Sequence, residues 1–232
     1  MSGLKKTLRR LVPYRVREAW NGYHATGRMT FHSQFGQDHF VASLIPERGK
    51  TFVEFGALDG MLHSNSLYFE QERGWTGLLI EANPSSFKAL KRNRPNAKIC
   101  NAAIFDRKGT VEFEKISGGY DGWSGIKESM EPQHQQRIDD GIRWWRNRTI
   151  NVPCRTLDDV LTEFEINHID YLSIDVEGAE LALLKVFPFQ RYSIDVLGVE
   201  DNFGNPELDE LICSNGFRFL QTLGPDRFYR FG

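Results

Sequence analysis

Cysteine is scarce in this chain of 232 residues, and a long apolar run is missing. Cys100, Cys154 and Cys213 are odd in number and widely spaced, which excludes a disulfide framework and a zinc site built on paired cysteines. We expect them to be buried as small apolar side chains. No stretch approaches the roughly 18 apolar residues that cross a bilayer, and the basic start of the chain lacks the apolar core of a secretory signal. These absences predict a cytoplasmic protein.

A basic surface that extends over the whole chain is also missing. The net charge is −2, and residues 156–232 carry fifteen acidic against five basic residues. This balance excludes a nucleic-acid-binding footprint. Basic residues gather instead in segment 1–30, where the leucines and valines of residues 1–20 recur near helical spacing. The pattern predicts a basic helical segment that either contacts the inner face of an anionic membrane or packs on the protein body.

Short apolar runs alternate with helical patterns from residue 51 onward, which indicates βαβ units and a mostly parallel sheet. Helix-start signals occur at Asn83 with Pro84, at Thr156, and at Asn205 with Pro206. Residues 217–231 predict two antiparallel strands around a Leu-Gly-Pro-Asp turn. The expected strand ends lie near Glu54, Glu81, Ala102, Asp175 and Glu200. The sequence therefore predicts one α/β domain over residues 31–232, with a seven-stranded sheet that closes in a C-terminal antiparallel hairpin.

Residues 117–150 interrupt this alternation and predict a lid-like insertion. Glycines cluster at its start, and Trp144 and Trp145 lie among arginines near its end. Together with Trp123, these rings would either stack on the apolar faces of a sugar or pack among themselves. Arg143 and Arg146 would meet phosphate or carboxylate groups of an acceptor.

The run FVEFGALDG at residues 52–60 is a strand that enters a glycine turn. It lacks the third glycine of the GxGxxG pattern, which disfavours a nicotinamide dinucleotide and suits a nucleoside with an amino-acid tail. Glu81 ends the next strand, where a carboxylate would either accept hydrogen bonds from ribose hydroxyls or support the helix begun at Asn83. The small side chain of Ala102 leaves room for adenine or allows tight helix packing.

Several motifs, in the order of the chain, resemble the FkbM family of S-adenosylmethionine-dependent methyltransferases. They are SQFGQD, FVEFGALDG, GWTGLLIEANP, NAAI, VPCRTLDD and IDYLSIDVEGAE. The resemblance runs from Phe31 to Phe231 and implies a Rossmann-like class I methyltransferase fold, an S-adenosylmethionine cofactor, and O-methylation of a sugar or polyketide hydroxyl. Leu58 departs from the family, which commonly has Asn at this position.

The resemblance also implies a cofactor site. Its residues would be Glu54, Gly56, Ala57, Asp59 and Gly60 for the methionine part and near ribose, Glu81 and Ala82 for the ribose, and Ala102 beside adenine. Ser64 and Asn65 would cap their helix near the cofactor carboxylate or serve only as a cap, and Gln34 and Asp38 would close the pocket from above.

Methyl transfer to an alcohol needs a general base or a metal ion that lowers the pKa of the hydroxyl. Asp175, at the switch point of the expected sheet, is our first candidate for either role. With Glu200 and Asp201 it would form an oxygen-only site for magnesium or manganese. His63 is an alternative base because its unperturbed pKa lies near 6.5.

These observations predict an O-methyltransferase acting on a sugar or glycan-linked hydroxyl. Three alternatives remain open at this point: a methyltransferase for a small polyketide-like product, a non-catalytic scaffold in glycan assembly that keeps the cofactor, and a nicotinamide oxidoreductase.

Overall fold

The computed structural model describes residues 31–118, 121–141 and 146–232. The predictions on segment 1–30 and on Arg143, Trp144 and Trp145 therefore lie outside the described residues. Within the described ranges, no helix is both long enough and apolar enough to cross a membrane.

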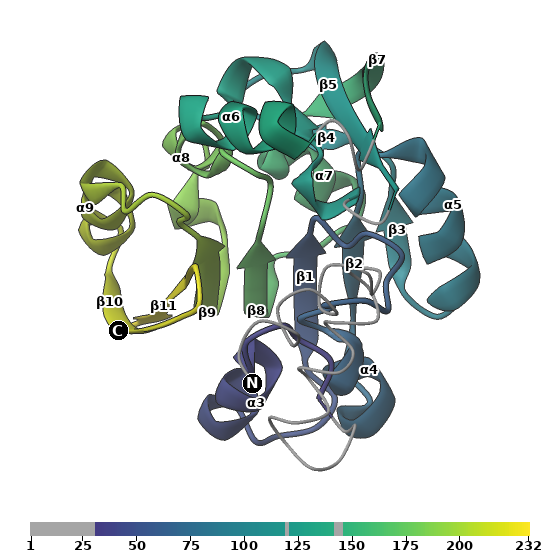
Figure 1. Ribbon diagram of the computed structural model, residues 1–232. Coiled ribbons are helices and arrows are strands. Elements are labelled where there is room, and N and C mark those ends of the chain that lie inside the picture. The colour runs from purple at the N-terminus through teal and green to yellow at the C-terminus, as the bar shows by residue number, and fades with distance from the viewer. Residues whose placement is uncertain (1–30, 119–120, 142–145) are drawn as a thin grey trace, which may run out of the picture.

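A seven-stranded sheet forms the centre of the molecule (Figure 1). Its order is β10 (Phe217–Leu223), β11 (Asp226–Phe231), β9 (Ser193–Glu200), β8 (His168–Ile174), β1 (Thr51–Phe55), β2 (Thr76–Ile80) and β3 (Lys98–Cys100). Strands β3, β2, β1, β8 and β9 are parallel, whereas β11 is antiparallel to both of its neighbours. The predicted mostly parallel sheet with a C-terminal hairpin is confirmed.

Helices cover both faces of this sheet, because successive strand side chains point to opposite sides. Val53 and Phe55 of β1 belong to one core with α7 (Leu157–Glu163), α8 (Glu180–Lys185) and α9 (Pro206–Ser214). Phe52 belongs to a second core with α3 (Gln37–Leu44), α4 (Leu67–Arg73) and α5 (Pro84–Asn93). The result is a three-layer sandwich whose parallel strands all end at one edge.

Local capping chemistry fixes where the helices begin and end. Asn83 accepts a hydrogen bond from the backbone of Ser85, with Pro84 in the first turn of α5, and Asn205 caps α9 in the same way. Thr156 caps α7, and Gly74 ends α4 in the left-handed conformation at φ 64°. The helix starts predicted at Asn83, Thr156 and Asn205 are therefore confirmed.

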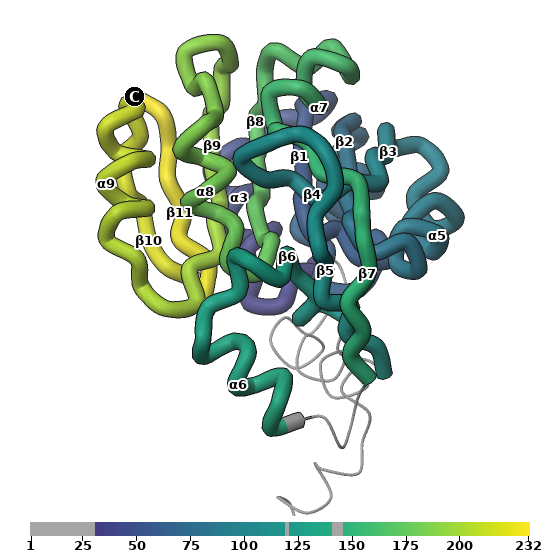
Figure 2. The backbone as a smooth tube through the Cα atoms, turned by 90° about the horizontal axis from the view of Figure 1, so that it is seen from above, coloured from purple at the N-terminus to yellow at the C-terminus, as the bar shows by residue number. Residues whose placement is uncertain are grey.

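A second, four-stranded sheet lies beyond the carboxyl ends of the parallel strands (Figures 1 and 2). It comprises β4 (Ala103–Ile104), β7 (Arg146–Arg155), β5 (Gly109–Ser117) and β6 (Gly125–Ile126), with α6 (Pro132–Gly141) before β7. Phe113 and Ile126 pack with Ala179 in a separate core. This sheet was not predicted, and it begins well before residue 117, directly after β3.

The cysteines only partly follow the expectation. Cys100 and Cys154 are buried, but Cys213 is exposed on α9, and all three are free. Cys213 lies near the end of an amphipathic helix, where only Leu208 and Ile212 turn inward.

Candidate active site

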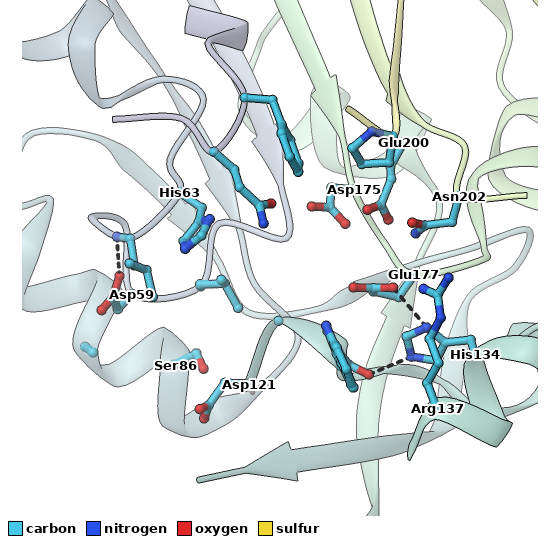
Figure 3. Close-up of a pocket in the computed structure, with 18 of the residues that line it drawn as sticks. Asp59, His63, Ser86, Asp121, His134, Arg137, Asp175, Glu177, Glu200 and Asn202 are labelled. Carbon is cyan, nitrogen blue, oxygen red and sulfur yellow. Dashed lines mark hydrogen bonds and ion pairs between the residues drawn. The ribbon is translucent and has the colours of Figure 1, made fainter. Parts of the chain in front are cut away.

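A pocket of about 390 Å³ opens at the edge where the parallel strands end (Figure 3). Asp175 follows β8 and Glu200 ends β9, and both line it together with Glu177 and Asn202. Trp123, His134 and Arg137 line it from the segment between β5 and β7. A second pocket of about 60 Å³ shares Asp175 and Glu177 with the first. The two pockets are therefore adjacent, and together they form the candidate site.

The smaller pocket is lined by residues that the sequence predicts beside adenine and the ribose. Ala82 and Ala102 line it with Glu81, and its remaining wall is largely apolar. The Glu81 carboxylate is 4% exposed and accepts hydrogen bonds from the amides of Leu58 (2.8 Å) and Asn83 (2.6 Å). Burial raises its pKa to about 7. Each oxygen holds one N–H group and keeps a lone pair for another donor, so Glu81 both supports α5 and faces the pocket.

The glycine turn after β1 approaches the end of β8 closely. Gly56 has φ 66°, and a Cβ atom there would lie 2.1 Å from the carbonyl oxygen of Asp175. Only glycine fits this position. Leu58, two residues later, has φ 50°, a conformation that an Asn side chain tolerates better than Leu.

Four residues expected at the cofactor are placed behind the pocket wall. Glu54 is 3% exposed and accepts hydrogen bonds from Ser64 Oγ (3.0 Å) and the Asn65 amide (2.8 Å). The buried guanidinium of Arg94 donates to Ser64 Oγ and to the carbonyl of Gly60. This network holds the turn between β1 and α4, so Glu54, Ser64, Asn65 and Gly60 shape the site without lining either pocket.

Of the other residues expected at the cofactor, some line a pocket and others are buried behind it. Gln34, Asp59 and His63 line the large pocket, and in Figure 3 Asp59 and His63 lie across it from Glu200. Ala57 is buried in the core. Asp38 is fully buried and accepts hydrogen bonds from the backbone at residues 32 and 33, so it holds the preceding turn.

The structure brings together Asp175, Glu177 and Glu200, each with a carboxylate oxygen within 4.8 Å of the others. Burial raises the pKa of Asp175 to about 8, and the nearby Asp226 adds to that shift. Burial and the neighbouring Asp175 hold the pKa values of Glu177 and Glu200 well above the ordinary range. Three acids at this spacing match the donor set that magnesium and manganese prefer.

Asp201, expected in this cluster, is replaced by Glu177. Asp201 follows β9 and is not part of the cluster, and its carboxylate accepts hydrogen bonds from the amides of Gly204 and Asn205. Glu177 lines the pocket, and its backbone adopts the left-handed conformation at φ 56°. The sequence signal that would have found Glu177 is its place in SIDVEG, two residues after Asp175.

His134 of α6 contacts Glu177 at 3.2 Å through Nδ1, and its Nε2 lies 3.0 Å from the carbonyl of Trp123. A carbonyl only accepts, so Nε2 carries a hydrogen. Burial lowers the pKa of His134 and raises that of Glu177. His134 therefore contacts both Glu177 and the Trp123 carbonyl in the wall of the pocket.

The strand order, the reversed C-terminal strand and the paired pockets at the carboxyl edge define a class I methyltransferase fold. The family model of the methyltransferase FkbM domain matches residues 54–219. The chain belongs to this FkbM family and is an S-adenosylmethionine-dependent methyltransferase.

A curated relative is the 2-O-methyltransferase NoeI of Sinorhizobium fredii, 26% identical over 184 residues that cover 76% of this chain and 71% of NoeI. Similar solved structures include the methyltransferase FkbM of Methylobacillus flagellatus, with a TM-score of 0.48 and 13% identity, covering 79% of this chain and 44% of that one. A TehB-like S-adenosylmethionine-dependent methyltransferase of Corynebacterium glutamicum has a TM-score of 0.46 and 10% identity, covering 94% of this chain and 96% of that one.

Proposed function

We propose that this chain is an O-methyltransferase that methylates a hydroxyl of a sugar or glycan-linked acceptor. The observation that carries the proposal is the shared wall of the two pockets at Asp175, which joins an adenosine-like pocket to a polar one. The polar pocket offers carboxylate oxygens that accept hydrogen bonds from several hydroxyls at once. The similarity to a 2-O-methyltransferase supports oxygen as the atom that is methylated.

Different pocket residues would bind different parts of the cofactor. Glu81 would hold the ribose hydroxyls, Ala82 and Ala102 would flank adenine, and Gly56 and Asp59 would lie along the methionine part. When bound, S-adenosylmethionine supplies a methyl group on a positively charged sulfur. Gln34 and Leu58 would exclude water from this half of the site, where alignment provides much of the rate.

Asp175 would accept the proton of the acceptor hydroxyl in this proposal. It faces both pockets, and Glu200 beside it would hold a neighbouring hydroxyl. His63, across the pocket, is the second candidate base. Alternatively, Asp175, Glu177 and Glu200 would hold a magnesium or manganese ion, which would supply a positive charge that lowers the pKa of the hydroxyl.

Calorimetric titration with S-adenosylhomocysteine, without and with magnesium or manganese, is the first test. Methyl transfer from labelled S-adenosylmethionine to a panel of methyl pyranosides follows, with and without a chelator. Cofactor binding and pyranoside turnover support the proposal. Turnover only with a macrolide aglycone would favour a polyketide-like acceptor, and binding without turnover on any alcohol would favour the scaffold.

In this proposal, residues 31–232 form one catalytic domain, and residues 1–30 form a separate N-terminal segment. The basic, leucine-containing pattern of residues 1–20 supports contact with an anionic membrane surface. Deleting residues 1–20 should abolish co-sedimentation with anionic liposomes, and unchanged sedimentation would refute the membrane contact.

A further inference from the structure

Phe35 is an exposed aromatic side chain that is nevertheless held in place. It is 46% exposed and lines the large pocket together with Pro225 and Glu200. Its segment, between Ser33 and α3, packs on the turn between β10 and β11. An apolar ring left open to solvent at a pocket rim suggests a binding role, because burying it against the body would be more favourable.

The turn between β10 and β11 provides a seat for the ring. Gly224 has φ 59°, and a Cβ atom there would lie 2.4 Å from Cδ2 of Phe35. The ring of Phe35 therefore occupies the space that any other side chain at position 224 would fill. Glycine at this position allows the ring to lie directly on the backbone.

Gln37 fixes the backbone of the same segment. Its Oε1 accepts a hydrogen bond from the Phe35 amide at 2.7 Å, and its Nε2 donates to the carboxylate of Asp226. Gln37 is 3% exposed and Asp226 is 7% exposed. Asp226 is the strand partner of Glu200 in the register of β11 and β9. This chain of contacts connects Phe35 to β9, the strand that ends at Glu200 of the acidic cluster.

We propose that Phe35 is the stacking platform for the acceptor sugar and thereby a specificity-determining residue; this inference rests on the proposed function. A pyranose ring has an apolar face of C–H groups and a polar edge of hydroxyls. The exposed ring of Phe35 matches the apolar face, while Asp175 and Glu200 in the same pocket match the hydroxyls. Stacking on Phe35 directs a hydroxyl toward Asp175.

The test compares Phe35→Ala, Phe35→Leu and Phe35→Tyr in the full-length chain. Methyl pyranosides are the acceptors in the transfer assay, and they are also the ligands in saturation-transfer NMR with S-adenosylhomocysteine present. We expect the acceptor KM to rise about fivefold to tenfold in Phe35→Ala, in line with the loss of one aromatic contact. Phe35→Leu, which keeps apolar area but no flat ring, should behave like Phe35→Ala, and Phe35→Tyr should stay near the parent.

Phe219→Ala is the matched control, because Phe219 is 45% exposed but lies on β10 outside both pockets. It should change neither KM nor the affinity for S-adenosylhomocysteine. A weaker affinity of Phe35→Ala for S-adenosylhomocysteine with an unchanged acceptor KM would make Phe35 a cofactor cover and overturn the platform. An unchanged KM and affinity would overturn it as well.

Two outcomes distinguish a failure of this inference from a failure of the proposed function. If pyranosides are methylated but Phe35→Ala has the parental KM, the function stands and the platform falls. If the parent binds S-adenosylhomocysteine but neither binds nor methylates a pyranoside, the sugar acceptor itself is wrong and the platform falls with it.

Discussion

Asp175 lies at the end of β8, in contact with the turn after β1 and within reach of both pockets. Replacing it by Asn keeps the shape of the side chain but removes the proton acceptor. We expect Asp175→Asn to lower kcat by about 10²-fold to 10⁴-fold, the range that general base catalysis provides. The affinity for S-adenosylhomocysteine should change little, and calorimetry with single-turnover assays checks both quantities.

The comparison variant for Asp175→Asn is His63→Gln, which tests the other candidate base on the opposite wall. A near-parental rate for Asp175→Asn together with a large loss for His63→Gln would transfer the role of base to His63. Because the pKa of Asp175 is raised to about 8, the rate of the parent should rise with pH up to that value and then level off.

Leu58 adopts a left-handed conformation, at φ 50°, that costs a non-glycine residue about 1–2 kcal/mol and that Asn adopts more readily. Leu58→Asn should therefore raise the melting temperature by about 2–4 °C, the shift that about 1 kcal/mol produces in a domain of this size. Differential scanning calorimetry measures the change. The amide of Leu58 would still donate to Glu81, so the affinity for S-adenosylhomocysteine should be kept.

Glu165→Asn serves as the control for Leu58→Asn. Glu165 has a similar φ of 56° at an exposed position just after α7, and it lines neither pocket. It should show the same gain in melting temperature. A gain at Glu165 but a loss at Leu58 would mean that the Leu58 side chain stabilises the pocket by more than its backbone strain costs.

Individual site residues were partly predictable from the sequence. Asp175, Glu81 and Glu200 follow directly from the rule that strand ends of a parallel sheet carry the site. The spacing of the strand ends favours Asp201 over Glu177, because spacing does not reveal which of these acidic side chains meets Asp175 and Glu200 in the folded chain. Glu54 was expected at the cofactor, but its partners Ser64 and Arg94 come from other elements and could be identified only in the folded chain.

At the scale of elements, the close approach of the turn after β1 to the end of β8 depends on Gly56. Gly56→Ala would place a methyl group 2.1 Å from the Asp175 carbonyl and would also strain φ. We expect a loss of stability of about 3 kcal/mol or more, from overpacking combined with backbone strain. Chemical denaturation provides the measurement, and weaker binding of S-adenosylhomocysteine should accompany it.

Gly74→Ala separates the effect of backbone strain from that of overpacking. Gly74 has almost the same φ, 64°, but nothing lies within 4 Å of the position of its Cβ atom. The free energy of unfolding of Gly74→Ala should fall only by the cost of the backbone strain, about 1 kcal/mol. Equal losses for the two variants would show that the contact between the β1 turn and Asp175 relaxes without cost.

Elements that carry local signals were predicted well, and those that depend on distant pairing were not. The caps at Asn83, Thr156 and Asn205 act within one turn of helix, so the sequence alone reveals them. The second sheet pairs Gly109–Ser117 with Arg146–Arg155 across an intervening helix, and no local pattern reports such a pairing. For this reason the sequence indicates an interruption of the βα alternation only from residue 117, where glycines accumulate.

At the scale of the whole molecule, the site lowers the stability that the fold would otherwise have. Asp175, Glu81 and Asp226 have pKa values raised to about 8, 7 and 6, well above the ordinary range of these carboxyl groups. Between the unfolded and the folded values, the folded chain holds protons that the unfolded chain has released. The free energy of unfolding therefore falls as pH rises through this window, by up to about 1.4 kcal/mol per pH unit for each group.

We therefore predict that the melting temperature falls continuously from about pH 5 to pH 8, over the interval in which these carboxyl groups ionise. Asp175→Asn removes one of them, so its melting temperature should exceed that of the parent most clearly at pH 8 and should fall less steeply with pH. Glu210→Gln, at an exposed position on α9, is the control and should follow the parental curve. A melting temperature that rises toward pH 8, or an Asp175→Asn curve parallel to the parent, would show that Asp175 is already ionised in the folded chain. In that case Asp175 would be available as a base at neutral pH without the activation that burial provides.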